Sequence, residues 1–206
     1  MKGLKSLLLI CLVFLITEAF SQHRYTIIIA GKKVGQVTAD MQKKNGKTQM
    51  HILSEAKATV LWKRYDKTVE WDLEFDHNGK MTRSILVAHY NGDLEDSVLL
   101  ALKNLTYTGF KFPKEKIHYP SPIYHVTSHL FFEEPVGIDS VYSERFHEFC
   151  KVESPEKGKY KLFLPEGTIN NYEYDEEGLV EIFIDRPWFN LRIKRTDEEL
   201  KKVSNK

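Results

Sequence analysis

The chain has 206 residues, with 30 lysines and arginines against 29 aspartates and glutamates, so its formal net charge at pH 7 is +1. A broad nucleic-acid or anionic-membrane surface needs a basic excess, so we expect no nucleic-acid partner. The length favours a single domain, and hydrophobic residues at 42% are enough to build its core.

The N-terminus has the three parts of a secretory signal peptide. Lys2 and Lys5 precede an apolar run at residues 7–16, and Ala19 and Ser21 place small residues where a signal peptidase binds. The run is shorter than the roughly 20 residues that cross a bilayer as a helix. We therefore expect cleavage after Ser21, a periplasmic or secreted protein, and no membrane-spanning segment after cleavage.

Cleavage would change both the charge and the cysteine content. Removal of residues 1–21 leaves 185 residues, with 28 of the 30 basic and 28 of the 29 acidic residues, and a net charge of zero. Of the two cysteines only Cys150 remains, so no internal disulfide is expected. We interpret Cys150 as a small buried apolar residue. An intermolecular bridge or a catalytic thiol is the alternative.

Alternation of apolar and polar residues dominates the chain after this leader. The stretch "TVEWDLEF", residues 68–75, places apolar side chains on one face and acidic side chains on the other. The same alternation recurs at residues 160–164, 180–184 and 189–193. Such a period of two is typical of a half-buried strand, because successive side chains point to opposite faces.

Turn sequences separate these runs. They are pairs that end in glycine: Asn45-Gly46, Asn78-Gly79, Asn91-Gly92, Glu166-Gly167 and Glu177-Gly178. Asn-Gly favours the tight turns of antiparallel hairpins. We therefore predict an all-β, mainly antiparallel domain over residues 22–196, with about ten strands in one curved meander sheet that closes toward a barrel. A two-sheet β-sandwich is the alternative, and residues 197–206 are expected to form a polar tail.

One segment departs from the period of two and predicts a helix over residues 122–132. A proline occupies the expected first helical position, and Ile123, Val126 and Leu130 recur at three- and four-residue spacing. Pro135 prevents the helix from continuing. We expect this helix to cover an opening of the barrel.

Two histidines on that helix raise the question of a metal. His125 and His129 are four residues apart and would share a face, with Glu133 one turn further. Val126 stands where a metalloprotease motif needs glutamate, which excludes that motif. We interpret both histidines as solvent-facing, keep them as weak metal candidates, and expect no cofactor.

The stretch "DSVYSERFHEFCKV", residues 139–152, combines a serine, acids and a histidine. On an extended strand Ser143 and His147 would lie about 13 Å apart at roughly 3.3 Å per residue. A general base must be within hydrogen-bonding reach of its nucleophile. We therefore interpret this stretch as a structural strand. A periplasmic hydrolase that uses glutamates and histidine within residues 133–148 is the alternative function.

Aromatic residues on the expected inner face are the candidates for a ligand-binding site: Tyr142, Phe146, Tyr172, Tyr174 and Trp188. Aromatic side chains on strands ordinarily belong to the core, so packing is the competing interpretation.

Three glutamates near the predicted helix are interpreted as structural. Glu133 and Glu134 end that helix, where a carboxylate opposes the helix dipole and needs a partner, and Glu144 follows on the next strand. We expect Arg145 or a backbone N–H group to supply that partner.

Four stretches occur in an order that resembles a known family. They are "VGQV", "FFEEP" at residues 131–135, "YSERFHEF" at 142–149 and "YKLFLPEGTINNYEY" at 160–174. The family consists of exported β-rich proteins of the Bacteroidota and is catalogued as a domain of unknown function. His147 stands where that pattern has glycine, and Glu166 where it has aspartate.

The resemblance implies a Gram-negative exporter and a periplasmic destination, and it brings no activity. The sequence favours a noncatalytic exported protein that binds an apolar or amphipathic ligand inside a β-shell, or an envelope protein as partner. A third hypothesis is a structural adaptor that pairs through an exposed sheet edge.

Overall fold

The computed structural model describes residues 19–60, 63–186 and 189–196, which form fourteen β-strands and one short 3-10 helix, η1. Their bounds are β1 Ala19–Ile29, β2 Lys32–Lys44, β3 Lys47–Val60, β4 Lys63–Phe75, β5 Met81–Tyr90, β6 Asp93–Lys103, β7 Thr106–Lys111, β8 Glu115–Tyr119, η1 Thr127–Phe131, β9 Ser140–Ser143, β10 Glu148–Glu156, β11 Lys159–Phe163, β12 Ile169–Asp175, β13 Gly178–Arg186 and β14 Phe189–Arg195.

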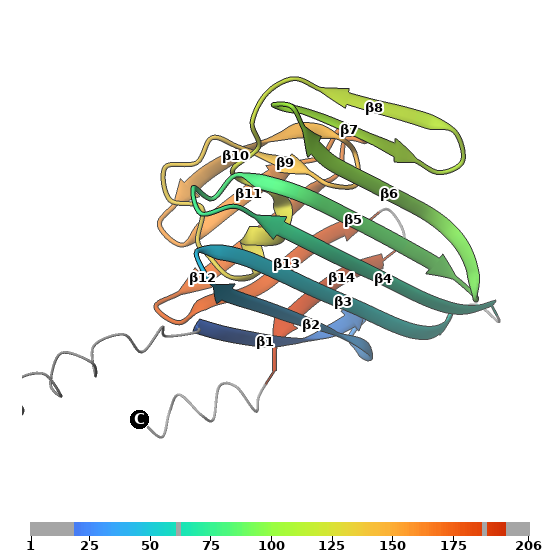
Figure 1. Cartoon of the computed structure of the whole chain (residues 1–206). Helices are drawn as coiled ribbons and strands as arrows, with labels where there is room; N and C mark the ends of the chain where they lie inside the picture. Colours follow the sequence, from blue (N-terminus) through green and yellow to red (C-terminus); the bar gives the residue numbers. More distant parts are fainter. Residues whose placement is uncertain (1–18, 61–62, 187–188, 197–206) are drawn as a thin grey trace, which may run out of the picture.

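All fourteen strands belong to one curved antiparallel sheet (Figure 1), as the sequence predicts. The order is β8-β7-β6-β5-β4-β3-β2-β1-β14-β13-β12-β11-β10-β9. The first and last strands pair in its middle, with Tyr25 opposite Arg195 and Ile29 opposite Leu191. The edges are therefore β8 and β9, which follow one another in sequence. The sheet has the strand order of a barrel that is left open between these two edges.

The count of about ten strands is too low, because short strands lack an obvious pattern. β7 and β8 have only six and five residues. The turn between β6 and β7 is formed by Asn104 and Leu105, with φ angles of 48° and 68°. Leucine rarely adopts a left-handed conformation, so the sequence gives no turn signal there.

The turns that contain Asn-Gly do connect neighbouring strands. Asn45 and Gly46 join β2 to β3 with φ angles of 53° and 73°, and Asn91 and Gly92 join β5 to β6 with 53° and 91°. Positive φ at both central residues is what a tight hairpin turn requires, and asparagine and glycine adopt it most readily.

The inner face of the sheet buries two apolar clusters. The first contains residues of β1–β3 and β9–β13 together with Leu130 of η1, and the second contains residues of β3–β7 together with Ile117, Ile123, Val126 and Tyr142. Trp71 packs against both clusters, so the two form one connected core.

The predicted helix over residues 122–132 is wrong in extent and type. The only helical turn in this segment is the 3-10 helix η1, and Val126 before it is extended, with φ −125° and ψ 161°. Backbone pairing explains the difference. The N–H of Met81 donates to the carbonyl of Ile123 at 2.8 Å, and the N–H of Tyr142 donates to His125 at 2.8 Å. These tertiary bonds satisfy the backbone in place of helical ones.

The apolar side chains singled out in that segment are nevertheless buried. Ile123 and Val126 are 0% exposed and Leu130 is 3% exposed. Their spacing therefore identified an inward face correctly, although the backbone that presents it is mostly extended.

The stretch at residues 139–152 is a hairpin and not one strand. β9 ends at Ser143, and the N–H of His147 donates to the Ser143 carbonyl at 2.9 Å before β10 begins at Glu148. His147 has a φ of 61°, the left-handed conformation that reverses the chain. In this register Tyr142 lies opposite Phe149.

The predicted cleavage site after Ser21 falls inside β1, where Ser21 lies opposite Met41. Leader residues 1–18 and the predicted tail at 197–206 lie outside the described residues. Within the described part of the chain, no helix has the length and apolar character needed to cross a membrane.

Candidate functional site

The interior of the curved sheet is occupied by the segment that connects its two edges, residues 120–139. Tyrosine hydroxyls from several strands donate to this segment. Tyr25 donates to the carbonyl of Phe131 at 2.9 Å, and Tyr174 donates to the carbonyl of Leu130 at 2.7 Å. Because η1 lies inside the curved sheet (Figure 1), these hydroxyls from β1 and β12 hold the connecting segment in place.

Two further tyrosines act at either end of the same segment. The Tyr107 hydroxyl accepts from the N–H of Ile123 at 3.2 Å, and the Tyr160 hydroxyl donates to Glu134 Oε1 at 2.7 Å. The polar atoms of these large side chains are thus used to bind the chain's own backbone and carboxylate. The tyrosine-rich interior therefore serves a structural purpose.

Glu144 belongs to this interior and is 1% exposed. One carboxylate oxygen accepts from the N–H of Ser128 at 3.0 Å, and the other accepts from the Thr127 hydroxyl. Glu133 and Glu134, for which Arg145 or a backbone N–H group was the expected partner, instead lie near the Lys43 amine and the Tyr160 hydroxyl. Arg145 is not the partner, because it is exposed and its guanidinium lies over the ring of Phe146 at 5.7 Å.

The aromatic residues predicted to bind a ligand do not form one site. Tyr172 and Tyr174 lie in the first apolar cluster, and Tyr142 lies in the second. Phe146 lies in the β9–β10 turn, and Trp188 lies outside the described residues. The hairpin separates Phe146 from Tyr142, which a continuous strand would have placed on one face.

Tyr142 has an unusual environment for a tyrosine. It is fully buried, its hydroxyl has no hydrogen-bond partner, and burial raises its pKa. Its ring contacts Tyr119 of β8 and Phe149 of β10, with centroid separations of 5.8 and 5.5 Å. Tyr142, on the open edge β9, therefore packs against Tyr119 on the other open edge, β8.

The two histidines considered for metal binding lie side by side but in different environments. Their ring centroids are 6.5 Å apart. His125 is exposed, whereas burial lowers the pKa of His129 to about 4. The Nδ1 atom of His129 accepts from the N–H of Val126 at 3.2 Å. His129 is therefore not solvent-facing as predicted, and one of its two nitrogens is already used.

The candidate hydrolase residues do not converge. Neither ring nitrogen of His147 has a hydrogen-bond partner, so the ring is not oriented toward Ser143 as a base. Glu133 is exposed, with its carboxylate 3.9 Å from the Lys43 amine. Glu134 is bound by a tyrosine as described above. These groups thus lack the chain of contacts that activates a nucleophile.

Cys150 is 1% exposed, and burial raises the pKa of its thiol to about 11. The interpretation of this residue as a buried apolar group is confirmed. A thiol protonated at neutral pH is a poor nucleophile.

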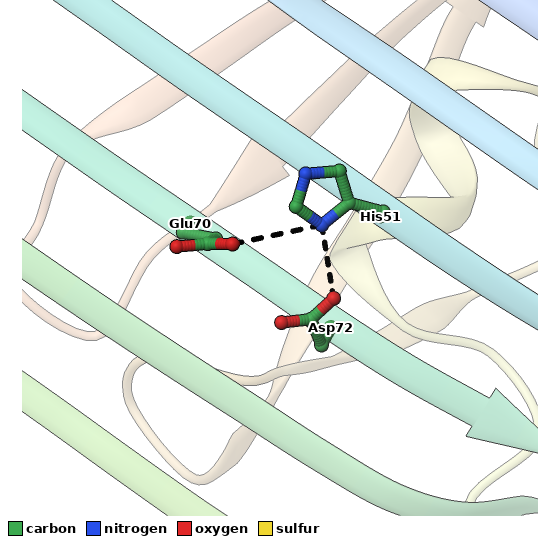
Figure 2. A group of neighbouring side chains, drawn as sticks. All are labelled: His51, Glu70 and Asp72. Atoms are coloured by element: carbon green, nitrogen blue, oxygen red, sulfur yellow. Dashed lines mark hydrogen bonds and ion pairs between the residues drawn. The ribbon is translucent and has the colours of Figure 1, made fainter.

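A cluster that the sequence patterns did not reveal lies on the outer face of β3 and β4 (Figure 2). His51, Glu70 and Asp72 each present one ligand-type atom, and these three atoms lie within 4.8 Å of one another. The Nδ1 atom of His51 is 2.9 Å from Asp72 Oδ1 and 3.8 Å from Glu70 Oε1. In the described part of the chain, this is the one such group of three.

Strand register assembles this cluster. His51 lies directly opposite Asp72, and Glu70 lies two residues earlier on the same face of β4. The residues are about twenty positions apart in sequence, so only the pairing of β3 with β4 brings them together. The alternation of "TVEWDLEF" places Glu70 and Asp72 on the same outer face, and this was the part of the cluster that the sequence could have indicated.

The outer face also carries an apolar row formed by Ile85, Leu99 and Phe110. Ile85 lies opposite Leu99, and Leu99 lies opposite Phe110, on the successive strands β5, β6 and β7. Leu99 and Phe110 are each 44% exposed. Asp72 precedes the row on β4, and Lys116 follows it on β8.

A protein family and a solved structure are similar to this chain. Residues 25–196 match the model of a family described as "Domain of unknown function (DUF6134)". The fold is similar to the "Crystal Structure of Beta-barrel-like Protein of Domain of Unknown Function DUF1849 from Brucella abortus", with a TM-score of 0.56 and 9% identity. That match covers 87% of this chain and 98% of the other. At this identity it shows the fold alone. None of the curated proteins matches.

Proposed function

From the premise that this chain belongs to the family described as a domain of unknown function (DUF6134), we propose that it is an exported, noncatalytic protein that binds an envelope partner. The partner is a protein of the periplasm of a Gram-negative bacterium of the Bacteroidota. An amphipathic segment of this partner binds to the outer face of β5–β7.

The apolar row carries this proposal. One face of an antiparallel sheet packs on the core and the other is usually polar. Here Ile85, Leu99 and Phe110 are cross-strand neighbours on the outer face, and the last two are nearly half exposed. Adjacent exposed apolar side chains favour an interaction site over a purely solvated surface.

The charges at the ends of the row define the partner's chemistry. Asp72 lies beside Ile85 at one end, and Lys116 lies beside Phe110 at the other. An amphipathic segment with an apolar stripe between a basic and an acidic residue matches this order. A purely apolar molecule would use the row but neither of the two charges.

Occupation of the interior supports the outer face over the inner one as the binding surface. Residues 120–139 fill the inside of the sheet, and Tyr25, Tyr107, Tyr160 and Tyr174 bind that segment. A ligand in the interior would have to displace these bonds. A partner on the outer face displaces only water.

Export is supported by the composition of the leader and by the extent of the family match. The match begins at residue 25, after the predicted cleavage site at Ser21. Intact mass of the protein isolated from the envelope fraction is expected to show loss of residues 1–21. Full-length chain in the cytoplasm would contradict export.

Site-specific photocross-linking in the native host tests the partner. A photoreactive residue at Leu99 or Phe110 is expected to give one shared adduct with an envelope protein. The same residue at Lys161, exposed on β11, is the matched control and is expected to give none. Leu99→Lys should abolish the adduct from position 110.

Three outcomes would contradict the proposal. Equal adducts from position 161, or no adduct from either apolar position, would remove the outer row as a binding surface. An adduct with the mass of two copies of this chain would replace the envelope partner with self-association.

A further inference from the structure

The arrangement of His51, Glu70 and Asp72 has the donor set of a metal centre. Each residue offers one ligand atom, and the set combines one imidazole nitrogen with two carboxylate oxygens. Figure 2 shows both carboxylates directed at the same ring nitrogen, Nδ1 of His51. Such convergence from two strands places the donors around a common point.

The separations fit a small divalent ion. Zinc binds nitrogen and oxygen ligands at about 2.0–2.2 Å in a tetrahedral arrangement, which sets neighbouring donors roughly 3.3 Å apart. The separations from Nδ1 of His51 are 2.9 Å to Asp72 and 3.8 Å to Glu70. These two separations lie on either side of the required one. Shifts of the donor atoms by less than about an ångström would therefore bring both separations to it.

The backbone beneath the donors is rigid. β3 and β4 pair over thirteen residue pairs, and His51 and Asp72 form the fourth pair from one end of that ladder. The neighbouring strand β2 places Asp40 directly opposite His51 on its other side. A metal site on strands needs little ordering of the chain on binding, which favours affinity.

The local charge favours a cation. Glu70 and Asp72 are two carboxylates on one face of β4. Arg83 of β5 is 3.1 Å from Glu74 and so already has a carboxylate partner. The side chains of the three donors are 41–48% exposed, which leaves water or a further ligand access to the ion.

The mixed donor set selects the class of metal. Calcium and magnesium prefer sites made entirely of oxygen ligands. Imidazole together with carboxylates suits zinc and its first-row neighbours. We propose that His51, Glu70 and Asp72 bind a zinc-class divalent cation on the outer face of the sheet. The site shares Asp72 with the proposed partner surface, but zinc binding does not require the partner.

Zinc titration by calorimetry tests the site directly. The protein is first stripped with a chelator and then titrated with Zn²⁺, with the expected result of one equivalent bound. His51→Gln and Asp72→Asn are each expected to raise the Kd at least about tenfold. His118→Gln, an exposed histidine on β8, is the matched control and should leave the Kd within about twofold.

Melting temperature gives a second readout. Zn²⁺ should raise the Tm of the wild-type protein and of His118→Gln but not that of His51→Gln, because a ligand that binds only the folded state stabilises it. Equal concentrations of Mg²⁺ or Ca²⁺ should not displace zinc. Metal-free melts of all variants check that each one folds.

Two results would overturn the proposal. One is the absence of zinc binding by the wild-type protein at about millimolar concentration. The other is an unchanged Kd in both His51→Gln and Asp72→Asn, which would make the cluster an ordinary surface ion pair and locate any bound zinc elsewhere.

Discussion

At the scale of single residues, Glu144 shows how a buried carboxylate is stabilised without an ion pair. Its oxygens accept from the Thr127 hydroxyl and the Ser128 N–H at the beginning of η1. That is the role of an N-cap side chain. Val126 occupies the cap position and has no side-chain oxygen, so the acceptor comes from the β9–β10 turn. Glu144 thereby ties this turn to the connecting segment.

Glu144→Gln is expected to lower the free energy of unfolding by about 1–3 kcal/mol. The amide keeps the shape but loses the charge, and its NH₂ group cannot accept a hydrogen bond. Urea unfolding measures the change. Arg145→Ala is the control and should change stability by less than about 0.5 kcal/mol, because Arg145 is exposed. Equal losses in the two variants would contradict this assignment.

His129 makes stability depend on pH. Burial lowers its pKa to about 4, against roughly 6.5 in an unfolded chain. Between these values the unfolded state binds more protons, so stability falls as pH falls from about 6.5 to 4. The loss reaches about 3 kcal/mol.

His129→Asn should therefore flatten the dependence of the unfolding free energy on pH between about 6.5 and 4, although it lowers stability at pH 7. His118→Gln should leave the slope unchanged. Burial also lowers the pKa of His147, so part of the slope should persist in the His129 variant. An unaltered slope in His129→Asn would show that other groups cause it.

At the scale of elements, β14 holds the turn between β12 and β13 through Arg195. This side chain is 6% exposed, and its guanidinium binds Asp175 at 2.9 and 3.1 Å. It also donates to the carbonyls of Gly178 at 2.7 Å and Leu179 at 3.0 Å. Burial alone would raise the pKa of Asp175, but the bonds from Arg195 and from the backbone N–H of Glu177 together lower it.

Arg195→Met is expected to lower the free energy of unfolding by about 1–3 kcal/mol. The low end applies because Asp175 is 45% exposed, and solvent compensates part of its charge. Lys194→Met is the matched control, because Lys194 is exposed on the same strand. Thermal or urea unfolding distinguishes them, and a larger loss for Lys194→Met would contradict the role given to Arg195.

At the scale of the whole molecule, the edges β8 and β9 do not pair as strands, so the sheet stays open. Side-chain contacts and the connecting segment link the two edges instead. Tyr119 of β8 contacts Phe149 of β10 at 5.8 Å between ring centroids. The amine of Lys111 donates to the carbonyl of Arg145 at 3.4 Å. Val126 forms a single parallel bridge with β9. Side-chain contacts and one bridge at Val126 therefore link the two edges in place of a β8–β9 ladder.

The sequence by itself determined the local properties of this protein. Period-two alternation identified the strands and their inward faces, and Asn-Gly pairs identified tight turns, because both depend on neighbouring residues alone. The burial of Ile123, Val126 and Leu130 followed in the same way from their spacing.

The tertiary structure decided which of these faces meet. The segment with helical spacing became mostly extended because Met81 and Tyr142 offered its backbone better partners. His51 meets Asp72 only through the register of β3 and β4. Register and edge pairing depend on contacts between residues far apart in the chain. Local sequence pattern does not encode these contacts. The cluster of His51, Glu70 and Asp72 and the unpaired edges β8 and β9 were therefore visible only in the tertiary structure.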